Sequence, residues 1–283
     1  MAPQLVFGAG VLGMDGMEFQ DRESVTKLLV TLKELGVIRL DTAARYPLFN
    51  PGKSERLLGE ANAVSGEFVI DTKVYTEVGD GSGDLTRAAM EKSVTGSLER
   101  LDRPEGVNVL FAHRPDPATP LEEQVQSFQD QVARGHAKAW GVANHPPETL
   151  QKIIELCEQR SWLKPSWYQG GYSMLTRGPE TRLFPILRAH GMSFLASHAL
   201  ASGFLTGKHI DDNGNPTGRF AQSGYAAPEV ATAMKKFIAG CASKLAQVGD
   251  TVANIRRGPL PAPVVTLVDE LWDAVKPIRG SMI

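Results

Sequence analysis

The regular alternation of short apolar runs and helical segments constrains the fold of this chain more than any other feature. Apolar runs rich in β-branched residues begin at residues 4, 36, 67, 106, 137, 165 and 192. These starts lie roughly 27 to 39 residues apart, which is typical of repeating βα units around a parallel sheet. Helical spacing predicts helices at 21–36, 84–102, 120–135, 146–160, 180–191, 228–249 and 258–277.

Seven such units without an obvious reversal favour a (β/α)8 barrel, and we expect residues 1–283 to form a single domain. The alternative is an open doubly wound sheet. Gly8, Gly10 and Gly13 have the glycine spacing of a dinucleotide-binding turn, and Asp41 ends the second strand as that fold requires. However, the first helix is expected to begin only near residue 21, so we prefer the barrel. The eighth strand is the difficulty, because no clear strand follows residue 198.

Polar side chains stand at the ends of four successive predicted strands. They are Asp41, Lys73, His113 and Asn144. Each has an ordinary structural explanation: an aspartate caps a loop, a lysine reaches solvent, and a histidine packs. Because the carboxyl ends of the strands form the active-site face of such a barrel, we expect all four to point into one mouth. Tyr46 lies one loop beyond Asp41 and is expected to fold back over it, although it too has a bland role as a loop-packing residue.

A tyrosine beside a lysine and an aspartate suggests a proton donor. A free phenol loses its proton near pH 10, too high for an efficient donor at neutral pH. A neighbouring ammonium stabilises the phenolate, and a carboxylate fixes the ammonium in place. We therefore expect Asp41, Lys73 and Tyr46 to form such a chain, with His113 donating a hydrogen bond to a carbonyl oxygen as hydride reaches its carbon.

At these residues the sequence resembles the aldo-keto reductases, and within them the aflatoxin-aldehyde reductase-like branch. The segments "DTAARY", "DTK", "LFAHRPD", "GVAN", "YQGGYSMLTR" and "GFLTGK" occur in family order, and the last two, with "GRF", resemble that branch specifically. The resemblance implies a (β/α)8 barrel that reduces aldehydes and ketones with NADPH. The family's catalytic tetrad falls on Asp41, Tyr46, Lys73 and His113.

The resemblance also implies a set of cofactor contacts. Those expected residues are Asn144, Gln169, Ser197, Leu200, Gly203, Lys208 and Arg219, with Ser243, Lys244 and Gln247 at the 2′-phosphate end. Lys244 has a bland alternative as a solvated helix residue. Two positions depart from the family pattern: Ser197 stands where an aromatic residue usually stacks on the nicotinamide, and Ala143 replaces a serine.

A further departure follows Cys241. There "FIAGC" runs directly into "ASKLAQ", where the family carries a helix and the eighth strand, about 30 residues by the period of the repeat. A phosphate-binding segment needs free backbone N–H groups at a helix N-terminus, which a continuous helix would use in its own bonds. We therefore expect a chain break or a rearranged turn near Cys241 to Ser243.

Composition excludes several classes of partner. The net charge of -2 gives no reason to expect nucleic acid, and no apolar stretch approaches the ~20 residues of a membrane span. Two cysteines and the absence of a secretory leader pattern indicate a reducing, cytoplasmic location. A small carbonyl compound is the expected partner, no metal site is expected, and a homodimer is left open.

Two rival functions remain at this point. One is a barrel that keeps the cofactor fold as a binding or regulatory subunit, as channel-associated relatives do, although an intact tetrad argues against a pure scaffold. The other is an enzyme of the same fold that uses the tetrad as acid and base alone, for dehydration or cyclisation. The sequence does not name the substrate.

Overall fold

The computed structural model describes residues 4–77, 82–206, 209–211, 216–221, 226–240, 260 and 262–279. They fall into two compact units, one formed mainly by Gln4–Tyr168 and the other mainly by Gln169–His190 and Phe194–Ile283. The expectation of a single domain over 1–283 stays a prediction. The predicted junction at Cys241 to Ser243 lies outside the described residues.

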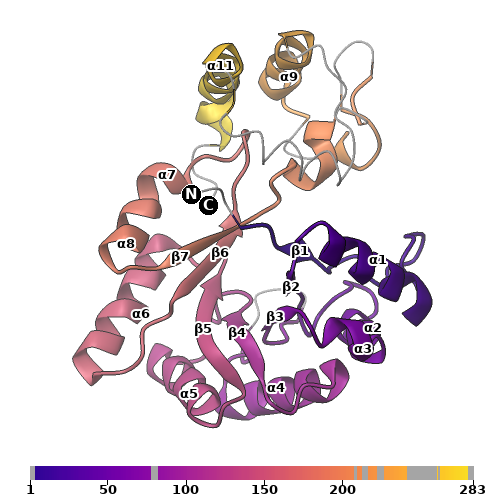
Figure 1. Cartoon of the computed structure of the whole chain (residues 1–283). Coiled ribbons are helices and arrows are strands. Elements are labelled where there is room, and N and C mark those ends of the chain that lie inside the picture. The colour runs from indigo at the N-terminus through magenta and orange to yellow at the C-terminus, as the bar shows by residue number, and fades with distance from the viewer. Residues whose placement is uncertain are drawn as a thin grey trace. The chain divides into compact units, whose positions relative to one another are not determined.

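The described strands form one seven-stranded sheet in chain order (Figure 1). The strands are β1 Phe7–Gly8, β2 Arg39–Asp41, β3 Val69–Lys73, β4 Val107–Ala112, β5 Ala137–Ala143, β6 Trp167–Gly171 and β7 Ser193–Ser197. Each pair from β1 to β5 is parallel. This sequential order confirms the barrel topology, because a doubly wound sheet would reverse its strand order part of the way along.

Six helices belong to the first unit and lie on the outer side of its strands in Figure 1. They are α1 Arg22–Glu34, α2 Lys53–Glu60, α3 Asn62–Ser65, α4 Arg87–Leu101, α5 Leu121–Ala133 and α6 Pro147–Arg160. The start of α1 follows from its sequence. Asp21 accepts from the backbone N–H of Ser24, and the Ser24 side chain completes a reciprocal capping box. Val25, Leu29 and Leu32 then bury the predicted apolar face.

The second unit contains shorter elements and two longer helices. They are α7 Pro179–Arg182, α8 Phe184–Ala189, the 3-10 turns Ala201–Thr206 and Gly218–Phe220, and the helices α9 Pro228–Gly240 and α11 Ala262–Arg279. Its apolar core includes Phe204, Phe220, Met234, Leu271 and Val275. The helix expected at 258–277 is confirmed as α11.

One predicted helix is wrong in detail. A single helix was expected at 180–191, but the structure has α7 and α8 in that region. Pro185 explains the break, because its nitrogen has no hydrogen to donate and its ring clashes with the preceding turn. The proline therefore sits in the first turn of α8, where its missing N–H costs nothing.

After β7 the described residues contain an isolated bridge between Ile210 and Pro216 but no named strand. The helix expected over 228–249 is observed as α9 up to Gly240, and its remainder lies outside the described residues. Among the helices that the structure describes, none has the length and apolar character needed to cross a lipid bilayer.

Candidate active site

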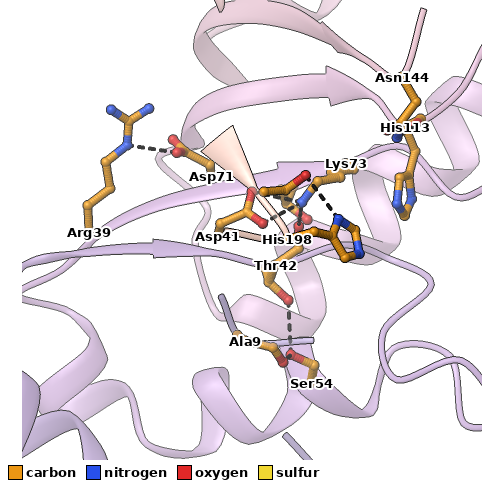
Figure 2. A network of polar contacts seen from close by, with 12 residues as sticks. Ala9, Arg39, Asp41, Thr42, Ser54, Asp71, Lys73, His113, Asn144 and His198 are labelled. Carbon is orange, nitrogen blue, oxygen red and sulfur yellow. Dashed lines mark hydrogen bonds and ion pairs between the residues drawn. The ribbon is translucent and has the colours of Figure 1, made fainter. Parts of the chain in front are cut away.

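A partly buried aspartate and a fully buried lysine at the carboxyl ends of β2 and β3 form the centre of the site (Figure 2). Parallel pairing sets Asp41 opposite Asp71, so Lys73 stands two residues further along the neighbouring strand and on the same face. The Lys73 ammonium donates to both Asp41 carboxylate oxygens at 2.7 Å and to the Thr42 carbonyl at 2.8 Å. All three ammonium hydrogens therefore have an acceptor.

The charge state of Lys73 follows from these contacts. Burial by itself would lower the pKa of Lys73, which is completely enclosed. The adjacent Asp41 carboxylate outweighs that effect, so the pKa lies above its ordinary value and the side chain is a fixed cation at neutral pH.

Tyr46 lies beside that cation. The Lys73 nitrogen is 5.1 Å from the centre of the Tyr46 ring. Gly10 also lies close to the Tyr46 ring, because a Cβ built on Gly10 would stand 3.5 Å from it. Two backbone bonds hold the loop: the Tyr46 N–H donates to Ala43, and the Ser54 N–H of α2 donates to the Tyr46 carbonyl. The loop tyrosine therefore folds back over the strand ends, as expected.

Buried hydroxyl groups tie this loop to the barrel. Ser54 has no exposed surface, and its hydroxyl donates to the Ala9 carbonyl at 2.8 Å. The Thr42 hydroxyl lies 3.0 Å from the Ser54 hydroxyl oxygen. Residues after β1, after β2 and on α2 are thereby joined through one side chain (Figure 2).

His113 completes the cluster immediately after β4. Its ring meets the Tyr46 ring edge-on, with centroids 5.6 Å apart and planes at 89°. Burial lowers the pKa of His113 to about 3, and the positive charges of Lys73, Arg114 and Arg45 act in the same direction. The imidazole is therefore neutral at physiological pH and has one N–H to donate. Its backbone carbonyl accepts from the Asn144 amide at 3.0 Å.

Of the ten expected cofactor residues, only Asn144 belongs to the same unit as the tetrad. It is exposed, adopts a left-handed backbone conformation with φ of 60°, and uses its amide nitrogen in the bond to His113. Gln169 lies on β6 and Ser197 ends β7. Leu200 directly precedes the turn at Ala201–Thr206, and Gly203 lies within it. All four belong to the second unit. Lys208, Ser243, Lys244 and Gln247 lie outside the described residues, as does the side chain of Arg219.

Sequence reasoning missed a second ion pair within the first unit. The Arg39 guanidinium donates to Asp71 at 2.7 Å and stacks over the Trp167 ring, 4.0 Å from its centre. Burial raises the pKa of Asp71, and Arg39 and Asn108 offset this only in part. The signal was present, because Arg39 and Asp71 each precede a tetrad residue by two positions and so share its strand face.

Within the part of the chain that the structure describes, no group of three or more His, Cys, Asp or Glu side chains is arranged to hold a metal ion.

Comparisons with known proteins agree with this geometry. The sequence model described as the Aldo/keto reductase family matches residues 4–243. A human protein named aflatoxin B1 aldehyde reductase member 4 is 33% identical over 222 residues, which cover 77% of this chain and 65% of the relative. The chain thus spans less than two thirds of that relative's length. An aldo-keto reductase of Pseudocercospora fijiensis is 27% identical over 88% of this chain and 97% of its own.

Among solved structures, an aldo-keto reductase from Bacillus halodurans in its holo form superposes with a TM-score of 0.68. The alignment covers 96% of this chain and 93% of the other, at 20% sequence identity. At that identity the likeness supports the fold alone.

Proposed function

Because the chain belongs to the aldo/keto reductase family, we propose that it reduces an aldehyde or ketone to an alcohol with NADPH and that Tyr46 donates the proton. The observation that carries the proposal is the Lys73 ammonium, held by both oxygens of Asp41 and set beside the Tyr46 ring. A scaffold protein would have no use for a fully buried cation at that position.

The proton transfer follows from the charges in the site. When a carbonyl carbon gains hydride, its oxygen becomes negatively charged and needs a proton. Tyr46 gives up its hydroxyl proton to that oxygen, and the resulting phenolate is stabilised by the adjacent Lys73 ammonium. Asp41 keeps the ammonium in place, so no reorganisation is needed at the moment of transfer.

His113 has a different part in this proposal. Since its imidazole is neutral at physiological pH, it does not compete with Tyr46 as an acid. It instead donates one hydrogen bond to the carbonyl oxygen and so orients the substrate beside the Tyr46 ring, which the His113 ring meets edge-on.

The residues around the tetrad suit a nicotinamide cofactor, which when bound supplies the hydride. Asn144 is exposed, and its amide oxygen has no partner among the described residues while its nitrogen is fixed on His113. A carboxamide such as that of nicotinamide offers the N–H that this oxygen accepts. Gln169 and Ser197, on strands β6 and β7 of the second unit, are polar side chains of the kind that hydrogen-bond a carboxamide.

NADPH oxidation in the presence of an aldehyde panel, followed by absorbance, tests the proposed function. Quenching of protein fluorescence by NADPH separates it from the rivals. A protein that binds NADPH but reduces no carbonyl compound would be a binding subunit, and one that does not bind NADPH would use the tetrad for acid–base chemistry alone.

A further inference from the structure

The buried ion pair between Arg39 and Asp71 lies two residues before the tetrad along the same two strands. Arg39 Nε donates to Asp71 at 2.7 Å, and the two side chains are only 5% and 0% exposed. Strands of a parallel barrel usually bury apolar side chains at such positions. A buried ion pair is often no more stabilising than apolar residues of similar volume, because both charges lose their water. Stability alone therefore does not explain this pair.

Asp71 is a second carboxylate within electrostatic reach of Lys73. Parallel pairing places it directly opposite Asp41, and Lys73 follows it by two residues on the same face of β3. Burial lowers the pKa of Lys73, whereas Asp41 raises it and Asp71 acts in the same direction as Asp41. One ammonium thus has two carboxylates near it. Figure 2 shows Asp71 between Arg39 and the Asp41–Lys73 pair.

Both oxygens of Asp71 are occupied by other donors. Oδ2 accepts from Arg39 Nε, and Oδ1 accepts from the Asn108 amide, each at 2.7 Å. The Arg39 guanidinium is fixed in turn by the Trp167 ring, whose centre lies 4.0 Å from it. The Asp71 carboxylate therefore has its charge and both its oxygens matched without Lys73.

We propose that Arg39 is a positioning residue, which holds Asp71 so that the Lys73 ammonium serves the proton donor. This inference rests on the proposed function and assigns a further residue to it. Without Arg39, the Asp71 carboxylate adds a negative charge beside Lys73 and competes for its ammonium. The phenolate that Tyr46 forms on giving up its proton is then less well stabilised.

Other charged or titratable groups also act near the proton donor. They are Asp41 and Lys73 at the ends of β2 and β3, His113 and Arg114 after β4, and Arg45 directly before Tyr46. None of these groups is altered in the variants below. Differences from wild type therefore report the charges of residues 39 and 71.

The pH dependence of aldehyde reduction tests the inference, with kcat/KM for 4-nitrobenzaldehyde and NADPH measured from neutral to alkaline pH. This kcat/KM falls where Tyr46 loses its proton. Arg39→Met leaves a negative charge that opposes loss of the proton, so the fall should move to higher pH by about one unit. Asp71→Asn leaves the guanidinium uncompensated and should move the fall to lower pH by a similar amount. The double variant should restore the wild-type profile, with NADPH affinity unchanged throughout.

Two sets of controls separate this effect from lost packing and from bare net charge. Arg39→Lys keeps the cation and loses the planar group on Trp167, so it should lower the melting temperature and leave the profile in place. Arg134 and Glu91 form a pair on the outer helices, with side chains 50% and 42% exposed. Arg134→Met and Glu91→Gln make the same changes in net charge where water screens them, so neither should move the profile.

The sign of the shifts decides the outcome. Shifts in the same direction for Arg39→Met and Asp71→Asn, or no shift in either, would overturn the inference, because lost packing alone produces no opposed pair. If Arg39→Met does not fold, Asp71→Asn decides: a fall at lower pH supports the inference, and an unmoved profile overturns it. A wild-type protein that reduces no aldehyde has a different signature, since it contradicts the proposed function and this inference with it.

Discussion

Lys73 donates to both carboxylate oxygens of Asp41 at 2.7 Å, from a side chain that is completely buried to one that is 13% exposed. The pair joins neighbouring strands, and its cation has a third acceptor in the Thr42 carbonyl. Breaking such a pair from one side leaves an uncompensated charge in the protein interior.

Asp41→Asn should therefore destabilise the fold as well as impair catalysis. We expect the free energy of unfolding to fall by about 3–5 kcal/mol, because the Lys73 ammonium keeps its burial and loses its counter-charge. The double variant Asp41→Asn with Lys73→Met should recover much of that loss. Urea unfolding of the three proteins measures both effects, and equal stability of wild type and Asp41→Asn would contradict the assignment of a buried cation.

Tyr46→Phe should leave the fold intact and remove the proton donor. The ring that packs on Gly10 and His113 is retained, so stability and NADPH affinity should change little. Carbonyl reduction should slow by roughly 10²–10⁴, the usual effect of losing a general acid. Steady-state turnover, with fluorescence quenching as the binding control, checks this. An unchanged kcat would exclude Tyr46 from the mechanism.

The sequence predicted the parallel sheet and the clustering of polar side chains at the strand ends because both depend on local pattern. Strand ends in a βα repeat must meet at one face, which is why Asp41, Lys73 and His113 came together as expected. The Arg39–Asp71 pair was missed for a physical reason. A charged residue inside a short apolar strand reads as an exposed position, and only pairing across strands shows that its partner is also buried.

Pro185 accounts for the helix that was predicted wrongly. Helical spacing continues through 180–191, but one missing backbone N–H divides the segment into α7 and α8. Helical periodicity depends on side-chain polarity alone, so it does not reveal the loss of a backbone hydrogen-bond donor.

The low pKa of His113 predicts a pH-dependent stability. Its folded-state pKa of about 3 lies below the ordinary value of 6.5, so protons bind preferentially to the unfolded state. The contribution of the neutral His113 ring to the free energy of unfolding is complete above pH 6.5. It is lost as the pH falls toward 3, at about 1.4 kcal/mol per pH unit. His113→Asn should therefore lose about 2 kcal/mol less stability than wild type between pH 7.5 and 5.0. Denaturant unfolding at the two pH values measures this, and identical losses would count against a buried neutral imidazole.

Lys244→Ala addresses cofactor choice. Lys244 belongs to the segment expected at the adenosine 2′-phosphate, a group that NADPH has and NADH lacks. Wild type should bind NADPH more tightly than NADH, and the variant should lose about tenfold of that preference, the scale of one charge-assisted phosphate contact. Fluorescence titration with both cofactors compares the two proteins. If both proteins show the same preference, Lys244 is a solvated helix residue that does not contact the phosphate.

Ser54 should position Tyr46 without touching the substrate. Its buried hydroxyl donates to the Ala9 carbonyl and contacts the Thr42 hydroxyl, and its own backbone N–H donates to the Tyr46 carbonyl. Ser54→Ala removes the side-chain bonds and should lower the free energy of unfolding by about 1–3 kcal/mol, because buried partners are left unsatisfied. The loop that carries Tyr46 then loosens, so kcat should fall while the affinity for NADPH holds.

Ser65 provides the matched control for this prediction. Ser65 ends the short helix α3 and is equally buried. Its hydroxyl donates to the Leu58 carbonyl at 2.7 Å. Ser65→Ala should therefore cost a similar free energy of unfolding and leave kcat unchanged. If the two variants lose stability and activity in the same proportion, Ser54 is a general packing residue. A lower kcat confined to Ser54→Ala at comparable stability would identify it as the residue that holds the loop of Tyr46 against the strand ends.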